Sequence, residues 1–319
     1  MDRRQFLIAS GGVLTLPTFA FSQPIETPSE SATIVVGFSA GGAGDLAARV
    51  AAEYAKQNRN YPVGVEFRPG AGGTIATDQV RRAPANGSVL SLYSASPILV
   101  APQIQNLPYN PLSDFTYITA FANTAIPAFV RADSPLQSWA ELLAFAKDNA
   151  GKLRWATAAP RGMAHIATEA AFRQEAVTGA FVPFSGGTDA ITALLGGHID
   201  MVVAADFAPH LRAGKVRLLA ESGPDPIAGH PDIPTFKQLG YPLSVASSYG
   251  LFGPADLPKP IVRFWEQAIQ DMLGTEVYGK FLTTLGGQET YEDSDALTAS
   301  VKTNFTDIGK QIELLGFAR

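Results

Sequence analysis

Residues Gly37–Arg49, with the sequence GFSAGGAGDLAAR, form the stretch best suited to bind a ligand. The apolar run Thr33–Val36 precedes it, and Asp45–Lys56 at its end has helical spacing. A glycine-rich loop therefore connects a buried strand to the N-terminus of a helix. Glycines let the backbone approach a ligand closely, and the first helical turn carries unpaired N–H groups and partial positive charge. This arrangement suits an anion, either a phosphate or a carboxylate.

Two enzymatic motifs also match this stretch. Gly37–Gly41 fits the G-x-S-x-G pattern of a nucleophile elbow, but Ser39 follows the first strand of the mature chain, and such a hydrolase needs several strands upstream. Gly42–Ala47 fits the dinucleotide pattern G-x-G-x-x-A, with Glu66 about 20 residues further on. Extra residues separate the strand from this fingerprint. We interpret the elbow match as accidental, and an exported NAD(P)-dependent oxidoreductase stays open as an alternative.

Three units of strand, small-residue loop and helix position the candidate loops. Val63–Phe67 is a second predicted strand, followed by the glycine turn Arg68–Thr74, and Val89–Tyr93 is a third, followed by Ser94–Ser96. Such repeated units predict a parallel sheet, whose ligands bind outside the carboxyl ends of the strands. The three loops therefore converge, and their backbone N–H groups predict a cradle for a small anion.

The middle of the chain repeats this plan without repeating the sequence. Its predicted strands with small-residue loops are Leu153–Thr157, Ala180–Phe184 and Ile199–Ala204. Predicted helices at 261–273, 274–285 and 294–315 return to the first lobe. We therefore expect lobe 1 to comprise residues 24–123 and 245–319, and lobe 2 residues 124–244. The hinge strands are expected near Phe121–Thr124 and Val245–Gly250.

The composition excludes several classes of protein. The 319 residues, 46% of them hydrophobic, can bury one large or two medium cores. A formal net charge of −5 without a basic patch argues against a nucleic-acid partner. The chain has no cysteine, which excludes disulfides, thiolate metal sites and a cysteine nucleophile.

Residues 1–22 have the pattern of a signal peptide. Arg3 and Arg4 precede the apolar run Phe6–Ala20, and small residues surround Phe21. The Arg-Arg-x-Phe-Leu pattern is typical of twin-arginine export. A run of about 15 mixed residues is too short to span a membrane. We therefore expect a periplasmic protein.

The order and spacing of many segments resemble a known receptor family over essentially the whole mature chain. These segments include Phe38, Gly41-Gly42, Asp45, Arg68–Gly73, Ala83–Ala85, His165, Val182–Phe184, Gly214–Arg217, Pro231–Thr235 and Tyr249–Phe252. They resemble the Bug family, the extracytoplasmic solute-binding receptors of the tripartite tricarboxylate transporter system. The resemblance implies an α/β type II periplasmic binding protein fold, with two lobes joined by hinge strands and the ligand in the cleft.

The resemblance also implies where the ligand binds. In the family, backbone amides and bound waters of the first-lobe loops hold the ligand's carboxylate, which maps to Ser39–Asp45 and Ala71–Thr74. The opposing wall maps to Ala159–His165, Ser185–Gly187 and Asp206. The expected ligand-binding residues are Phe38, Ser39, Gly41, Gly42, Ala43, Asp45, Ala71, Gly73, Thr74, Ser94, Ser96, Arg161, Gly162, Met163, His165, Gly186, Asp206 and Tyr249.

Several positions depart from the family pattern or carry two interpretations. Arg161 replaces part of a glycine- and serine-containing loop, and it either pairs with a ligand carboxylate or faces solvent. Met163 makes the wall more apolar, and Tyr249 stands where the family often has tryptophan. Asp45 either caps its helix or contacts a ligand amine, and His165 is either structural or a ligand contact.

No carboxylate pair, Ser/His/Asp set or metal cluster is recognisable in the sequence. We therefore expect a binding protein without catalytic activity, cofactor or metal, and a monomer. The expected ligand is a small carboxylated metabolite: a di- or tricarboxylate, an aromatic acid or an amino acid. The expected partner is the cognate permease. A ligand-sensing receptor for a sensor kinase is an alternative.

Overall fold

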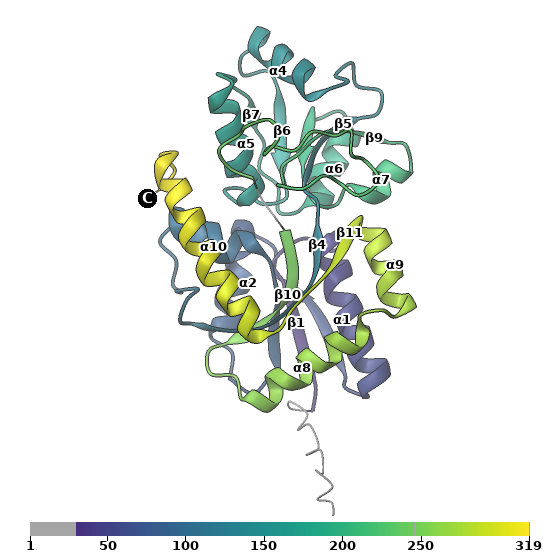
Figure 1. Cartoon of the computed structure of the whole chain (residues 1–319), viewed down its shortest axis with the longest axis vertical. Helices are drawn as coiled ribbons and strands as arrows, with labels where there is room; N and C mark the ends of the chain where they lie inside the picture. Colours follow the sequence, from purple (N-terminus) through teal and green to yellow (C-terminus); the bar gives the residue numbers. More distant parts are fainter. Residues whose placement is uncertain (1–29, 245–246, 319) are drawn as a thin grey trace, which may run out of the picture.

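Two lobes are stacked along the long axis of the molecule (Figure 1). The structure is a computed structural model, and it describes residues 30–244 and 247–318. The expected signal peptide, residues 1–22, lies outside the described residues, as do Val245 and Ala246 of the second expected hinge segment.

The first lobe is built on a six-stranded sheet with the strand order β11-β4-β10-β3-β1-β2. Its strands are β1 (Ala32–Val36), β2 (Val63–Phe67), β3 (Val89–Tyr93), β4 (Phe115–Thr124), β10 (Ser247–Pro254) and β11 (Gly287–Glu292). β1 pairs in parallel with β2 and β3, as the strand–loop–helix units predict. β10 is antiparallel to both β3 and β4, so the whole sheet is mixed.

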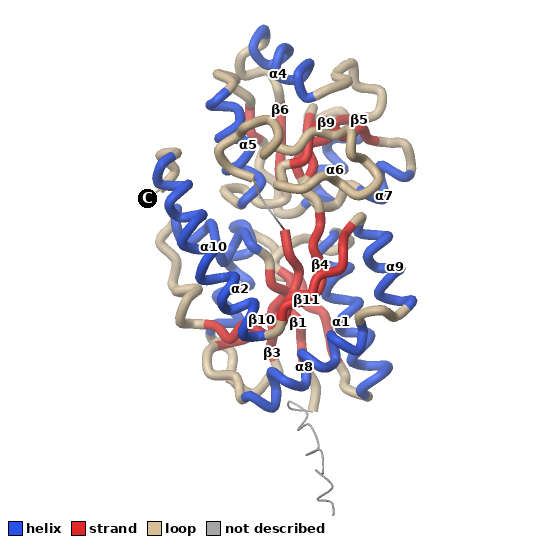
Figure 2. Tube along the Cα trace, viewed as in Figure 1, coloured by secondary structure: helices blue, strands red, loops and turns tan. Residues whose placement is uncertain are grey.

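Helices cover both faces of this sheet (Figure 2). They are α1 (Ala43–Arg59), α2 (Thr74–Arg81), α3 (Ala101–Ile104), α8 (Lys259–Met272), α9 (Glu276–Leu285) and α10 (Ser294–Leu314), with short turns η1 (Ala71–Gly73) and η2 (Ser96–Val100). Successive strand residues point to opposite faces. Ile34 and Val36 accordingly pack in the core that contains α1, α8 and α9, whereas Val35 packs in the core that contains α2 and α10. Both faces are buried, as is usual where crossover helices cover a parallel sheet.

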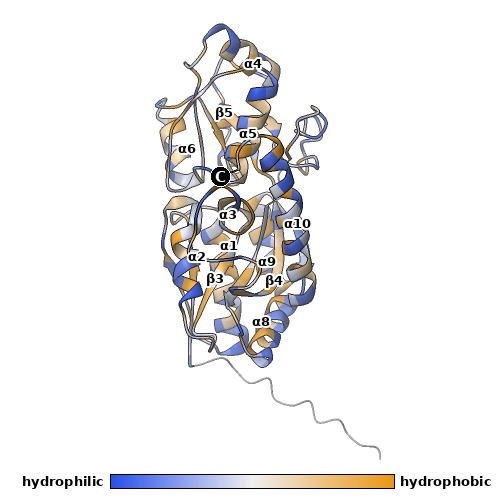
Figure 3. Cartoon of the chain, turned by 90° about the vertical axis from the view of Figure 1, so that its left-hand side faces the viewer, coloured by the Kyte–Doolittle hydropathy of each residue, from blue (hydrophilic) through white to orange (hydrophobic). Residues whose placement is uncertain are grey.

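The second lobe contains a five-stranded sheet with the strand order β7-β6-β8-β5-β9. Its strands are β5 (Pro127–Arg131), β6 (Arg154–Thr157), β7 (Ala180–Phe181), β8 (Met201–Val203) and β9 (Val216–Glu221). Its helices are α4 (Trp139–Asp148), α5 (Met163–Gln174), α6 (Gly187–Leu195) and α7 (Ala208–Arg212). Hydrophobic colouring concentrates inside each lobe, and α4 and α10 carry hydrophilic segments (Figure 3).

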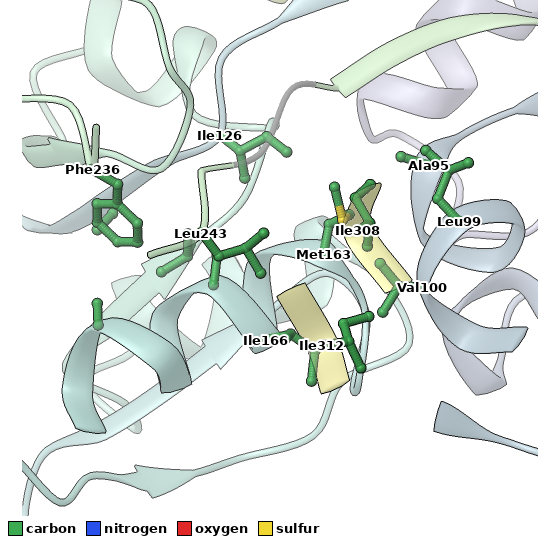
Figure 4. Close-up of a cluster of buried hydrophobic side chains, with 14 of the residues drawn as sticks. Ala95, Leu99, Val100, Ile126, Met163, Ile166, Phe236, Leu243, Ile308 and Ile312 are labelled. Atoms are coloured by element: carbon green, nitrogen blue, oxygen red, sulfur yellow. The ribbon is translucent and has the colours of Figure 1, made fainter. Parts of the chain in front are cut away.

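A cluster of buried apolar side chains spans the two lobes. Leu99 and Val100 of η2 and Ile308 and Ile312 of α10 belong to the first lobe, and they share this cluster with Met163 and Ile166 of α5 (Figure 4). Burying such side chains contributes roughly 1.5–3 kcal/mol each relative to exposure. The contact therefore favours the arrangement in which the lobes lie together.

Three elements differ from those expected. The predicted strand Ala180–Phe184 ends at Phe181, and Pro183 just beyond it has no N–H to donate to a sheet. β11 was not predicted, because its sequence GQETYE lacks the apolar alternation of a strand; it pairs with β4 at the sheet edge. The five-residue helix α7 was also missed.

No helix in the described ranges is both long and apolar enough to cross a membrane.

Candidate functional site

A cavity of about 80 Å³ lies between the lobes, where the loops after β1, β3, β6 and β8 meet the hinge strand β10. Nine of the expected ligand-binding residues line it: Phe38, Ser39, Gly42, Ala43, Ser94, Ser96, Met163, Asp206 and Tyr249. Gly44, Ala159, Ala164 and Gly187 also line it and fall within the expected walls or their loops. The structure therefore brings together residues from both halves of the chain.

The remaining lining residues lie outside the expected walls. Ala95 lies in the predicted loop Ser94–Ser96 and Ser247 in the expected hinge segment Val245–Gly250, and the others are Ile126, Ala158, Val203, Ala204 and Ala205. Most are small apolar residues at the ends of strands, and such residues occur at many positions that bind nothing. Ile126 could have been found only from its place in the connection between β4 and β5, because its residue type carries no signal.

The N-terminus of α1 opens into this cavity. The helix is capped by Gly42, which has extended backbone angles and no side-chain oxygen to accept a hydrogen bond from the first turn. The Ala43 amide instead donates to Oδ1 of Asp206, which belongs to the second lobe. The carboxylate of one lobe thus occupies the anion-binding end of a helix in the other lobe.

Asp45 supports this loop from inside the first lobe. Its Oδ2 accepts a hydrogen bond from the Gly41 amide at 2.8 Å, and its Oδ1 lies 2.5 Å from Nε of Arg49. Asp45 is 6% exposed and does not line the cavity. In this structure Asp45 therefore caps the loop through the Gly41 amide.

Further contacts join the two lobes around the cavity. Ser39 Oγ donates to Asp189 Oδ2 at 2.7 Å, and the Met163 amide donates to Ser96 Oγ at 3.2 Å. Gly72 and Pro160 approach so closely that a Cβ on Gly72 would lie 3.2 Å from the Pro160 carbonyl oxygen. These contacts describe a closed conformation.

The second glycine loop lies behind the first. Gly73, with φ near +94°, donates its amide to the Gly70 carbonyl at 2.9 Å, and Thr74 Oγ1 donates to the Ala71 carbonyl at 3.0 Å. A Cβ on Gly37 would lie 2.8 Å from Gly73 Cα, so the two loops pack backbone to backbone. Ala71, Gly73 and Thr74 do not line the cavity, and a direct role for them in binding stays a prediction.

Arg161 and His165 also lie outside the lining of the cavity. Arg161 is exposed, its φ is near +56°, and its amide donates to Nδ1 of His165 at 3.0 Å. The His165 ring packs against Phe181, with ring centroids 3.8 Å apart, and edge-on against Trp155. In this conformation His165 serves the packing of lobe 2, and the Arg161 side chain must turn inward to reach a ligand. Gly162 and Gly186, the N-caps of α5 and α6, and Gly41 are likewise outside the lining.

The electrostatics of the cavity are dominated by Asp206 and by helix ends. Burial raises the pKa of the Asp206 carboxyl, and the hydrogen bond from the Ala43 amide partly offsets that effect. Burial also raises the pKa of Tyr249, to which the nearby Asp206 carboxylate adds, so the phenol stays neutral at physiological pH. Within the described ranges, no group of three or more His, Asp or Glu residues is placed to hold a metal ion.

Known proteins are similar to this chain in sequence and in fold. Residues 47–317 match the TctC family model, described as the tripartite tricarboxylate transporter family receptor. The chain is 31% identical to protein BugT of Bordetella pertussis (strain Tohama I / ATCC BAA-589 / NCTC 13251), in a match covering 85% of this chain and 87% of BugT.

Two solved structures extend the comparison. The structure of the periplasmic binding protein BugD has a TM-score of 0.85 and 28% identity, covering 91% of this chain and 99% of BugD. MatC from Rhodopseudomonas palustris, with bound malate, has a TM-score of 0.81 and 26% identity, covering 89% of this chain and 99% of MatC.

Proposed function

The chain belongs to the Bug family of tripartite tricarboxylate transporter receptors, and from this premise we propose that it captures a small carboxylated solute between its lobes and delivers it to a membrane permease. The family is one of periplasmic binding proteins and not of enzymes. The observation that carries the proposal is the hydrogen bond between the Ala43 amide and the Asp206 carboxylate. It supports the proposal because it places a carboxylate, that of Asp206, on the first turn of α1 in the cavity between the lobes.

The proposed binding step uses backbone groups. In the open protein, water solvates the N–H groups of the first turn of α1, and a solute carboxylate replaces that water. Closure then brings Met163 and Asp206 of lobe 2 over the solute and removes the anion from water. Preorganised N–H donors compensate this loss of hydration, because they need no rearrangement when the solute arrives. The structural neighbour MatC was solved with malate bound, which supports a carboxylated solute here.

Other parts of the proposal rest on the sequence. The twin-arginine pattern in residues 1–22 supports export to the periplasm, where a receptor meets its solute before the permease does. We propose residues 24–123 with 245–319, and 124–244, as the two lobes that close. The protein acts as a monomer in this proposal, with one solute per chain.

A thermal-shift screen of the mature protein against small acids tests the proposed function. A bound solute raises the unfolding temperature, because it binds the folded protein and not the unfolded chain. We expect a concentration-dependent rise with at least one carboxylated compound and none with its carboxamide. Native mass spectrometry identifies any solute that co-purifies, and absorbance identifies a tightly held nucleotide. A nucleotide and no acid in the cavity would contradict the proposal and favour the oxidoreductase.

A further inference from the structure

The described lining of the cavity has an unbalanced set of charges. Among the described residues that line the cavity, Asp206 has the one acidic side chain, and none is Lys, Arg or His. Asp189, in the first turn of α6, adds a second carboxylate at the rim through its hydrogen bond with Ser39. The positive potential at the cavity therefore comes from helix N-termini and amides, and not from a cationic side chain.

This charge distribution discriminates among carboxylated solutes. The first turn of α1 has more than one free N–H group, so a single solute carboxylate can bind there beside Asp206. A second solute carboxylate would meet the Asp206 carboxylate without a cation between them, and like charges in a site of low dielectric repel strongly. A solute with a positive group beside its carboxylate instead gives Asp206 an opposite charge.

The rest of the lining is mainly apolar. Phe38, Ile126, Met163, Val203 and Tyr249 supply most of the large side chains, and alanines fill the strand ends. The polar side chains other than Asp206 are hydroxyls, which do not neutralise a second full charge. The body of the solute is therefore expected to be apolar.

From these observations we infer that the solute is an amino-acid-like zwitterion with an apolar side chain, whose carboxylate binds the first turn of α1 and whose ammonium pairs with Asp206. This inference rests on the proposed function and narrows it to one class of carboxylate. It makes Asp206 the specificity-determining residue of the cavity.

Matched sets of compounds test the inference by calorimetric titration of the mature protein. Each set contains an amino acid, the same acid without its amino group, and the same amine without its carboxylate. The sets are alanine, propionate and ethylamine; leucine, isocaproate and isoamylamine; and phenylalanine, hydrocinnamate and phenethylamine. Malate and adipate complete the panel. We expect at least one amino acid to bind at least about tenfold more tightly than its two partners and than either dicarboxylate.

The variant Asp206→Asn separates charge from shape. Its amide oxygen still accepts the Ala43 N–H, so the lobes keep this contact, but the negative charge is gone. We expect the preferred amino acid to lose at least about tenfold in affinity and its deaminated acid to lose none. Circular dichroism shows whether the variant is folded.

Three outcomes separate failure of the inference from failure of the proposed function. Tighter binding of the deaminated acids or dicarboxylates than of the amino acids overturns the inference and leaves the proposed function intact. The same holds if acids bind more tightly as the pH falls, because a protonated Asp206 would then be donating to a solute carboxylate. If no compound containing a carboxylate binds, the proposed function itself fails.

Discussion

The Asp206 carboxylate of the second lobe accepts a hydrogen bond from the Ala43 amide at the N-terminus of α1 in the first lobe. The two residues are 163 positions apart in the chain. Their contact shows that closure places an anion on a helix end that has no capping side chain of its own.

Replacing Ala43 with proline removes the amide donor. Ala43 is the first residue of α1, a position where helices tolerate proline, and Gly42 before it already has the extended backbone that proline requires. The Asp206 carboxylate then loses the hydrogen bond that holds it at the cavity, so we expect solute affinity to fall by about 1.5–3 kcal/mol, the size of a hydrogen bond to a charged group. Titration of the purified variant with the best solute of the thermal-shift screen measures the change.

The matched control is Glu276→Pro. Glu276 is the first residue of α9, follows a residue with extended backbone angles, and is not part of the cavity lining. The Glu276→Pro variant should have an unfolding temperature and a solute affinity within error of the wild type. An Ala43→Pro protein that is folded and binds the solute normally would show that the hydrogen bond between the Ala43 amide and Asp206 does not contribute to solute binding.

Gly187→Ala should displace Asp206. A Cβ at Gly187 would lie 1.6 Å from Asp206 Oδ2, so the carboxylate must move away from the Ala43 amide. We expect solute affinity to fall at least about tenfold and thermal stability to be equal or lower, because Asp206 loses its hydrogen bond to the Ala43 amide. Small-angle scattering of the variant without solute should show a more open molecule.

Gly279→Ala provides the comparison for this substitution. Gly279 also lies in a helix, and a Cβ there meets no atom within 4 Å. This variant should be slightly more stable, because alanine favours a helix interior over glycine by roughly 0.5–1 kcal/mol, and it should bind the solute normally. Equal affinities for the two alanine variants would refute the role given to the position of Asp206.

Glu221 at the hinge should make stability depend on pH. Its Oε1 accepts hydrogen bonds from the Ile126 and Gly223 amides at 2.9 and 2.7 Å, and its buried Oε2 has no hydrogen-bond partner. Burial raises the pKa of Glu221 from 4.5 to about 7. The folded protein therefore binds this proton more tightly than the unfolded chain does. The resulting stability is fully present below pH 4.5 and is lost as the pH rises through 7.

The rise of the Glu221 pKa from 4.5 to about 7 corresponds to a stability difference of about 3 kcal/mol. Glu221→Gln keeps an oxygen for both amides and cannot ionise. Urea unfolding at pH 5 and pH 8 measures the difference in stability between the two proteins at each pH. Because all other titrating groups are the same in both proteins, their contributions cancel in this difference. We expect the variant to be relatively more stable at pH 8. If the stability of both proteins changed equally between pH 5 and pH 8, folding would not raise the pKa of Glu221.

Export should depend on the guanidinium groups of Arg3 and Arg4. Lysine keeps their charge but not the planar donor fork, so the double change to lysine should leave the precursor unprocessed in the cytoplasm. Cell fractionation with immunoblotting measures this. The same double change at Arg81 and Arg82 should not affect export. Normal processing of the Arg3/Arg4 variant would indicate the general secretory route.

The sequence predicted the first wall of the cavity because glycine spacing between a strand and a helix has a direct backbone consequence. The loop of Phe38–Ala43 needed no knowledge of the rest of the fold. Asp206 was placed opposite it only through the family resemblance, since no local pattern relates two positions so far apart. Lining residues such as Ala158 and Ala204 escaped prediction because a small apolar side chain is compatible with almost any buried position.

The fold was predicted well where apolar periodicity is strong and poorly where it is weak. β1 and β3 alternate between two buried faces and were recognised close to their ends. β11 is polar and owes its conformation to backbone pairing with β4, which is a tertiary effect. The contact between η2, α5 and α10 across the lobes is also invisible in the sequence, because each segment alone has only an ordinary apolar face.

A crystal structure of the protein with the tightest-binding carboxylate of the panel tests the central claim most directly. We predict one bound molecule between the lobes, with a carboxylate oxygen within about 3.2 Å of an amide nitrogen in the first turn of α1. A solute whose carboxylate lies elsewhere, with Asp206 still on the Ala43 amide, would contradict the account.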